Sequence, residues 1–257
     1  MSEMLPLPSH PLLDSLWRRY VDDVPFARAF VELAGGPFEN DHIALRTLAK
    51  DGEGSGLAVF VSVFAALGWQ ERESYVFPDV HLRALYLAQP GLPRIFISEL
   101  DPKALPAPAR DHLLSIDGHP PAPTSTSLLA DWFAAPAQAP DRAAVDVVAR
   151  ASQYGAWLMC FGRRVNHFTA RVDDVALWQQ RLVAAGVPMK AEIEGDPIPP
   201  GGTGLRQTAT AAAELEVTFA DGEKARRPYA YFEIAERQGS FDGFLALQAR
   251  QLFDQTR

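Results

Sequence analysis

The chain is poor in cysteine and has no long apolar run. Cys160 is the only cysteine among 257 residues, so no disulfide can form within the chain and a reducing compartment is expected. No stretch reaches the roughly 18 consecutive apolar residues that a membrane-spanning helix needs, and the first residues lack the basic and apolar regions of a secretory signal. We therefore expect a cytoplasmic protein that does not associate with membranes.

The chain also has fewer basic than acidic side chains. Lys and Arg total 24 against 32 Asp and Glu, which leaves a net charge of −8. A nucleic-acid-binding protein needs a basic stripe, so we expect no nucleic acid among the partners. Hydrophobic residues make up 47% of the chain, which is enough for a packed core at this length.

Two short segments share a spacing that is rare by chance. The string HIALR occupies residues 42–46 and HFTAR occupies residues 167–171, so a His is followed four places later by an Arg in both. An Asn lies just upstream of each His, at Asn40 and Asn166. Each segment is also followed by a predicted helix and by further predicted strands. The spacing therefore indicates an internal repeat of two related modules.

The order of the predicted elements supports this duplication. Helical and strand periodicities alternate in the same order after each of the two strings. The predicted segments are N-terminal helices (11–36), a first βαβββ module (40–100), a proline-rich linker with short helices near 128–133 and 142–151 (101–155), a second βαβββ module (163–236) and a C-terminal helix (240–255). The sequence thus predicts one α+β catalytic domain over residues 1–257, in which the two modules form a cup-shaped mixed sheet.

The histidines of the repeat are candidate metal ligands. In a strand, residues two apart share a face. His42 and Arg46 therefore point to one side of their strand, and His167 and Arg171 do the same in the second module. If the modules face each other, the histidines converge, and two converging imidazoles supply half of a metal site. A lone strand histidine is more often a hydrogen-bonded structural residue, but the repeated position favours ligation.

Glu233 is the third candidate ligand. It lies between Phe232 and Ile234, in a run otherwise suited to burial, with no cation beside it. Because an unpaired buried carboxylate is very costly, Glu233 needs a partner, and a divalent metal held by His42 and His167 is one. Two His and one carboxylate on three strands make the facial triad of non-haem Fe(II) oxygenases, which leaves positions open for substrate and dioxygen.

Other polar residues have simpler interpretations. Glu236 is the nearest rival to Glu233, but it falls on the other strand face beside Arg237, so a surface ion pair accounts for it. The remaining histidines have no repeat partner and are expected on the surface or in turns: His10, His81, His112 and His119.

Four strings carry a resemblance to known families. The string NDHIALRT at residues 40–47, VNHFT at 165–169 and GLRQT at 204–208 resemble the 2-oxoadipate dioxygenase/decarboxylase family. The string YFEI at 231–234 is similar to the end of 4-hydroxyphenylpyruvate dioxygenase, where the equivalent Glu is an iron ligand. The first resemblance extends over most of the chain, from about residue 11 to 255.

The resemblance implies a vicinal-oxygen-chelate type of fold and an iron site. The implied Fe(II) ligands are His42, His167 and Glu233. It also implies that Arg46 is the catalytic-site arginine and that this arginine binds the substrate. We further expect Arg206 and Gln207 to contact the substrate. The implied reaction takes a 2-oxo acid and O2, converting 2-oxoadipate to 2-hydroxyglutarate and CO2, a step in lysine breakdown.

The position of Arg46 indicates how it acts. It shares a strand face with His42 and lies about 6–7 Å further along the strand. That distance suits bidentate pairing of its guanidinium with a substrate carboxylate while the other end of the substrate chelates the metal. Alternatively, Arg46 balances Glu233 or another acid. Arg171, its repeat counterpart, is expected to be structural.

Two other functions fit the same pattern. One is a metal-free binding module of the same fold that sequesters a small molecule. The other is an isomerase or lyase that uses Zn²⁺, Ni²⁺ or Mn²⁺ and commonly adds a second carboxylate ligand. Glu99, at the end of a first-module strand, is the candidate for that extra ligand.

Overall fold

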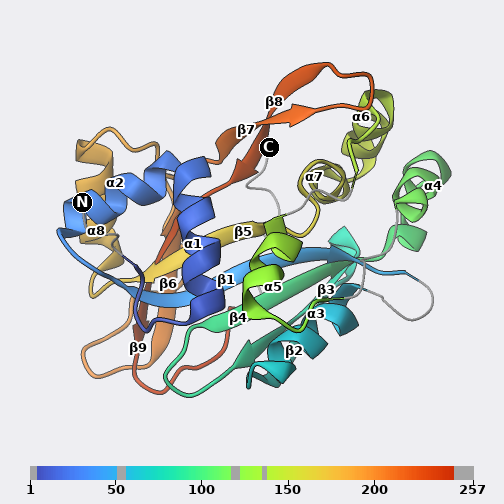
Figure 1. Ribbon diagram of the computed structural model, residues 1–257. Helices are drawn as coiled ribbons and strands as arrows, with labels where there is room; N and C mark the ends of the chain where they lie inside the picture. The colour runs from blue at the N-terminus through green and yellow to red at the C-terminus, as the bar shows by residue number, and fades with distance from the viewer. Residues whose placement is uncertain (1–4, 51–55, 117–121, 135–137, 246–257) are drawn as a thin grey trace.

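A seven-stranded mixed sheet forms the centre of the computed structural model, which describes residues 5–50, 56–116, 122–134 and 138–245 (Figure 1). The strand order is β2-β3-β4-β1-β5-β9-β6. The strands are β1 (Glu39–Leu48), β2 (Gln70–Phe77), β3 (Leu82–Ala88), β4 (Arg94–Leu100), β5 (Val165–Arg171), β6 (Gly204–Ala209) and β9 (Glu233–Gln238). The repeated strings lie in β1 and β5, which pair antiparallel at the middle of the sheet.

The first module has the element order that the sequence predicts. β1 is followed by α3 (Gly56–Ala66), β2, β3 and β4, with a short 3₁₀ helix, η1 (Pro78–Val80), between β2 and β3. Gly68 has a φ of +101° just beyond α3, a conformation that glycine adopts without strain. Gly68 therefore lets the chain turn from α3 into β2.

The second module begins as predicted and then departs from the repeat. After β5 and α8 (Val175–Ala184), the strand expected near residues 187–193 is an extended segment with only isolated bridges, Met189 to Thr210 and Glu194 to Gln207. β7 (Ala213–Thr218) and β8 (Lys224–Ala230) form a separate hairpin before β9 returns to the main sheet. The α+β architecture with two related modules on one curled sheet is confirmed.

The N-terminal helices cover one face of this sheet. α1 (Pro11–Asp23) and α2 (Pro25–Ala34) match the prediction, and Gly35, with a φ of 70°, ends α2. The rings of Trp17 and Tyr20 lie 5.1 and 5.0 Å from the ring of Phe168 in β5. Because neighbouring residues of a strand point to opposite faces, this packing leaves His167 on the other face.

The segment between the modules contains several helices, of which the sequence analysis predicted only the two near residues 128–133 and 142–151. They are η2 (Pro102–Ala104), α4 (Ala107–Ser115), α5 (Thr126–Ala134), α6 (Arg142–Ala151) and α7 (Gln153–Phe161). α7 is apolar on all sides and therefore shows no amphipathic period. Its Tyr154 hydroxyl accepts from the Thr47 backbone N–H at 3.1 Å and donates to the Ser98 carbonyl at 2.7 Å. These bonds fix α7 across β1 and β4.

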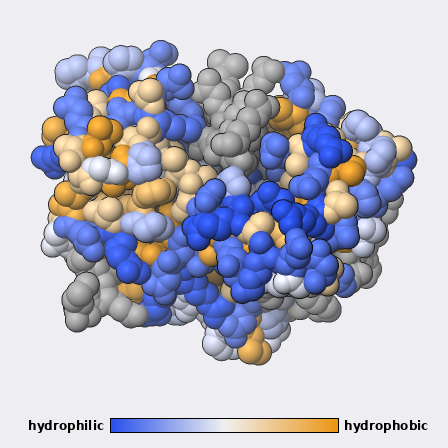
Figure 2. Space-filling model, turned by 90° about the horizontal axis from the view of Figure 1, so that it is seen from above, coloured by the Kyte–Doolittle hydropathy of each residue, from blue (hydrophilic) through white to orange (hydrophobic). Residues whose placement is uncertain are grey.

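The predicted C-terminal helix falls largely outside the described residues, and residues 241–245, which are described, are not helical. Within the described ranges, no helix combines the length and the apolar character needed to cross a membrane. Figure 2 shows a band of hydrophilic residues across the region of the β7–β8 hairpin, whereas apolar residues gather on the side of the N-terminal helices. The hairpin is covered by ion pairs such as Lys224–Glu216 and Arg226–Glu214.

Candidate metal centre

Three side chains meet on the face of the sheet that the N-terminal helices leave uncovered. We call this the polar face, and it carries His42, Arg46, His167, Thr169, Gln207 and Glu233. His42 Nε2 lies 3.3 Å from His167 Nε2 and 3.2 Å from Glu233 Oε1. All three side chains are buried, and one ligand atom of each lies within 4.8 Å of the other two. The structure therefore brings together the three residues that the sequence singled out.

The separations suit a single ion. Ligands at about 2.1 Å in adjacent positions of an octahedron lie about 3 Å from one another, close to the separations that His42 makes with His167 and Glu233. Thr169 donates to Glu233 Oε1 at 3.0 Å and so orients the carboxylate. The donor set, two imidazole nitrogens and one carboxylate oxygen, is that of a facial triad.

Two β-bulges orient the histidines. The pairing of β1 with β5 shifts register at Asp41 and again at Asn166, the residues directly before His42 and His167. An extra residue in a strand re-aims its side chain. Asp41 Oδ1 lies 2.8 Å from His42 Nδ1, and Asn166 Oδ1 lies 3.1 Å from His167 Nδ1. Both rings can therefore give their Nδ1–H to these oxygens, which leaves each Nε2 lone pair for a metal.

The Asn residues noted in the sequence are thus not equivalent to each other. Asn166 supports His167, but its counterpart in the first module is Asp41 rather than Asn40. The Asn40 amide lies instead against the carbonyls of His42, at 2.9 Å, and Thr169, at 3.1 Å, and these two acceptors assign its nitrogen, the donor, to that side. Asn40 therefore joins β1 to β5 beside the site.

Asp41 is held by a buried arginine. Arg237 Nε and Nη2 donate to the two oxygens of Asp41 at 2.7 and 2.9 Å, and Nη1 donates to the carbonyls of Phe241 and Gly243. Burial alone raises the pKa of Asp41, but hydrogen bonds from His42 and Arg237 outweigh it and hold the pKa well below its usual range. The sequence analysis placed Arg237 in a surface ion pair with Glu236, which is wrong.

The surroundings shift the pKa values of the two imidazoles in opposite directions. Burial tends to lower the pKa of His42, but hydrogen bonds to Asp41 and Glu233 raise it above its usual value. Burial lowers the pKa of His167 strongly, and the positive charges of His42 and Arg46 lower it further. Without a metal, these opposite pKa shifts favour a proton on His42 over one on His167. A metal ion bound at this position replaces that proton.

Arg46 lies on the polar face under α7. Its guanidinium carbon is 5.0 Å from the ring centres of both Tyr154 and Trp157. Nη1 is buried and has no hydrogen-bond partner among the described residues. Burial lowers the pKa of Arg46, and the groups that act in the opposite direction are Tyr231 and Tyr154 rather than an acid. The alternative that Arg46 balances Glu233 therefore has no contact to support it.

Two more buried polar atoms near the site have no hydrogen-bond partner in the described part of the chain. They are Gln207 Oε1 and the Tyr231 hydroxyl. The ring of Tyr231 lies 4.7 Å from that of His167. A buried polar atom without a partner costs about 1–3 kcal/mol, so each of these atoms is suited to a ligand. Sequence reasoning identified Gln207 but not Tyr231, although Tyr231 lies two residues before Glu233 and therefore on the same face.

The sequence of this chain is similar to those of known enzymes. The family model of 2-oxoadipate dioxygenase/decarboxylase matches residues 125–256. The chloroplastic/amyloplastic 2-oxoadipate dioxygenase/decarboxylase of Oryza sativa subsp. japonica is 30% identical over 256 residues, which cover 88% of this chain and 68% of that protein. This chain belongs to the 2-oxoadipate dioxygenase/decarboxylase family.

Other members extend this relationship to the fold. The chloroplastic 2-oxoadipate dioxygenase/decarboxylase of Arabidopsis thaliana is 30% identical over 77% of this chain, which spans 58% of that protein's length. The crystal structure of the Oryza sativa hydroxyglutarate synthase in complex with 2-oxoadipate superposes with a TM-score of 0.82 at 25% identity, covering 100% of this chain and 96% of that chain. The expected vicinal-oxygen-chelate type of fold is confirmed.

In this member of the family, two predicted residues lie away from the polar face. Arg206 points to the opposite face, where it pairs with Glu236 at 3.5 Å, and Glu236 also accepts from the backbone N–H of Val175 at the start of α8. Arg206 is therefore left out of the site proposed below. Glu99 is buried and is bound by Arg83 and by the backbone N–H of Leu57. It is not available as a second carboxylate ligand.

The other predicted positions are structural. Arg171 forms an exposed ion pair with Glu39 at 2.8 Å, as a structural role requires. His10 accepts from the Leu12 backbone N–H and caps α1, His81 follows η1 in a left-handed turn, and His112 lies on α4. His119 lies outside the described residues.

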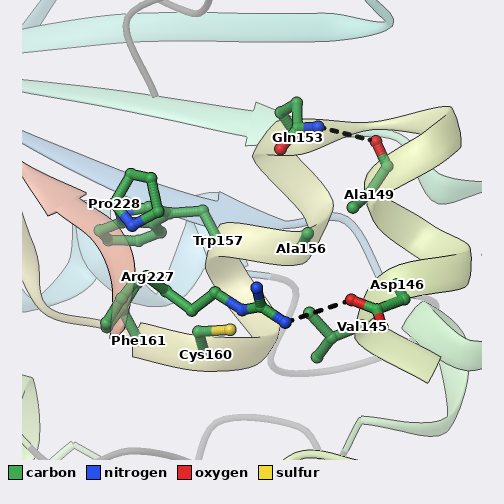
Figure 3. Close-up of a pocket in the computed structure, with 10 residues that line it drawn as sticks. All are labelled: Val145, Asp146, Ala149, Gln153, Ala156, Trp157, Cys160, Phe161, Arg227 and Pro228. Atoms are coloured by element: carbon green, nitrogen blue, oxygen red, sulfur yellow. Dashed lines mark hydrogen bonds and ion pairs between the residues drawn. The ribbon is translucent and has the colours of Figure 1, made fainter. Parts of the chain in front are cut away.

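A separate cavity of about 410 Å³ lies between α6, α7 and β8 (Figure 3). Arg227 and Asp146 form an ion pair across it at 3.2 Å. None of its ten lining residues belongs to the metal centre. Its wall includes Trp157, whose ring also contacts Arg46. α7 therefore separates this cavity from the polar face.

Replacing Asp41 by Asn is expected to weaken metal binding by about 10- to 100-fold, the usual effect of losing the carboxylate behind a ligating imidazole. The dissociation constant of the metal-depleted protein, measured by competition with a chelator, tests this. Asp22→Asn, which removes a charge from an exposed ion pair with Arg28, is the matched control. Equal affinities for the Asp41 variant and the control would contradict the role of Asp41.

Proposed function

We propose that this chain is an Fe(II)-dependent dioxygenase that decarboxylates and hydroxylates a 2-oxo dicarboxylic acid. The preferred reaction is 2-oxoadipate plus O2 to 2-hydroxyglutarate plus CO2, in which both atoms of dioxygen enter products and no separate reductant is needed. The observation that carries the proposal is the buried cluster of His42, His167 and Glu233, with 3.2–3.3 Å between neighbouring donor atoms. The family and the 2-oxoadipate bound to the rice relative support it.

Fe(II) held by His42, His167 and Glu233 would bind the 2-oxo acid by chelation and activate dioxygen beside it. The chain's own part is to hold the three ligands in place. Asp41 and Asn166 orient the imidazoles, and Thr169 orients the carboxylate of Glu233. Because these supports are buried, the ligand geometry is set before a metal arrives.

The polar face also offers binding groups for the rest of the substrate. Arg46 presents an unpartnered Nη1, and Tyr231 presents an unpartnered hydroxyl. A cation beside a neutral donor in a buried setting favours a carboxylate, because charge-assisted hydrogen bonds are the stronger ones. We assign Arg46 to the distal carboxylate of the 2-oxo acid, with Gln207 as a further contact.

The surroundings of His42 limit the access of water. The ring of Phe244 lies 4.8 Å from the His42 ring and also contacts Phe96 and Tyr86. The backbone N–H of Phe244 donates to the Tyr75 hydroxyl at 3.1 Å. This apolar cover protects an oxidising reaction from side reactions with solvent.

Oxygen uptake tests the function. Protein reconstituted with Fe(II) under anaerobic conditions should consume O2 and release an equal amount of CO2 with 2-oxoadipate. The response should be weaker with 2-oxohexanoate, which lacks the distal carboxylate. Zn²⁺-loaded protein is the control. No uptake above that control with any 2-oxo acid would reject the proposal and favour the metal-free binding module.

By family resemblance, we also expect the reaction to serve lysine breakdown in the cytoplasm.

A further inference from the structure

Glu194 is a further acid near the metal centre, and its side chain is largely buried. It lies on the extended segment beside β6, where its backbone exchanges two hydrogen bonds with Gln207, at 2.8 and 3.0 Å. Directly opposed residues in such a bridge point their side chains to the same face. Gln207 is two residues from Ala209, which lies opposite Glu233 in the β6–β9 pair. Glu194 therefore lies on the polar face.

The side chains of Glu194 and Gln207 also meet. Gln207 Nε2 donates to Glu194 Oε2 at 3.2 Å, and the Lys190 ammonium lies 3.9 Å from Glu194 Oε1. The Glu194 side chain is only 8% exposed. The amide nitrogen of Gln207 is turned toward Glu194, so its oxygen, Oε1, points the other way. Oε1 is buried and has no hydrogen-bond partner in the part of the chain that the structure describes.

Glu194 keeps this contact in either protonation state. Burial raises the pKa of Glu194 to about 7, and the negative charge of Glu233 adds to the effect. A carboxylate and a protonated carboxyl both retain an oxygen that accepts from an amide N–H. The hydrogen bond from Gln207 Nε2 therefore depends on the shape of the Glu194 side chain rather than on its charge.

We propose that Glu194 is a positioning residue that fixes the amide of Gln207 with Oε1 presented as a hydrogen-bond acceptor to a water molecule, which in turn donates to the bound substrate, because a 2-oxo dicarboxylate has no donor of its own. The inference rests on the proposed function, because it gives Gln207 a substrate to contact through that water. Arg46 and Tyr231 then supply the donors of the polar face, and Gln207 supplies its oriented acceptor. Without Glu194, the amide can rotate and present either end.

A double-mutant cycle tests the inference with Fe(II)-reconstituted protein and 2-oxoadipate. Glu194→Ala should raise KM about tenfold at unchanged metal content, because an unrestrained amide loses the oriented hydrogen bond. Glu194→Gln should restore a KM within about twofold of the wild type, since its carbonyl oxygen still accepts from Gln207 Nε2. Glu192→Gln, an exposed position in the same segment, is the matched control and should leave KM unchanged.

The decisive measurement is the combination of Glu194→Ala with Gln207→Ala. If Glu194 acts only through Gln207, the double variant has the same KM as Gln207→Ala alone. Losses that multiply would overturn the inference, and so would an unchanged KM in Glu194→Ala. Absence of turnover in the wild type is a different result, because it rejects the proposed function together with this role. Thermal midpoints of the metal-free variants show whether any of them fails to fold.

Discussion

Replacing His42, His167 or Glu233 by Ala is expected to abolish metal binding and turnover together. Each side chain supplies one of three protein ligands, and a two-ligand remnant holds a divalent ion weakly. We expect the iron content to fall from about one ion per chain to less than about one tenth, and the turnover number to fall by about a thousandfold or more. Metal analysis and oxygen uptake on the same samples measure both quantities.

The fold should survive these substitutions. The sheet is supported by the N-terminal helices on its other face, where Trp17 and Tyr20 pack on Phe168, and none of those contacts involves a ligand. Metal-free wild type is the reference for the thermal midpoint, and His112→Ala, on α4, is the matched histidine control. Full activity in any one of the three ligand variants would remove that residue from the site.

Replacing Arg46 by Lys should leave iron bound but raise KM for 2-oxoadipate at least tenfold, a loss of about 1.4 kcal/mol. A lysine carries the charge but cannot reproduce the planar, bidentate guanidinium or its packing between two aromatic rings. The aromatic packing is present here, since the ring centres of Tyr154 and Trp157 both lie 5.0 Å from the guanidinium carbon of Arg46. Steady-state kinetics with iron-loaded protein provide the measurement.

The substrate panel identifies which end of the substrate Arg46 binds. With 2-oxohexanoate, which lacks the distal carboxylate, the Arg46→Lys variant should lose little relative to the wild type. An equal loss for both substrates moves Arg46 to the chelating end, and no loss for either makes it structural. Arg171→Lys, the repeat counterpart in an exposed ion pair with Glu39, is the control and should not change KM.

The metal cluster could be predicted because it depends on a duplicated pattern. Equivalent strands of two related modules place equivalent residues alike, so the HIALR and HFTAR strings brought His42 and His167 together once β1 and β5 paired. Glu233 was identified because burying an unpaired carboxylate costs free energy, so a carboxylate in an apolar strand needs a partner. Both arguments use only the repeat, strand alternation and the apolar character of neighbouring residues, all of which can be read along the chain.

Several supporting residues escaped prediction because their partners are far away in the chain. Arg237 meets Asp41 across 196 positions of sequence, so the sequence shows only its neighbour Glu236. Glu194 lies just beyond an expected strand that forms only isolated bridges, so its pairing with Gln207 could not be predicted from the sequence. α7 is apolar all round and carries no period, yet it supplies the rings on Arg46.

The sequence by itself determined the α+β class, the two modules and the three candidate ligands, because periodicity, repetition and the cost of a buried charge are written along the chain. Only the tertiary structure decided which oxygens orient the imidazoles, because β-bulges at Asp41 and Asn166 arise from the pairing of β1 with β5. It also decided that Arg206 lies on the far face while Gln207 lies on the polar face. Register between distant strands sets these positions, and register depends on the packing of the whole sheet.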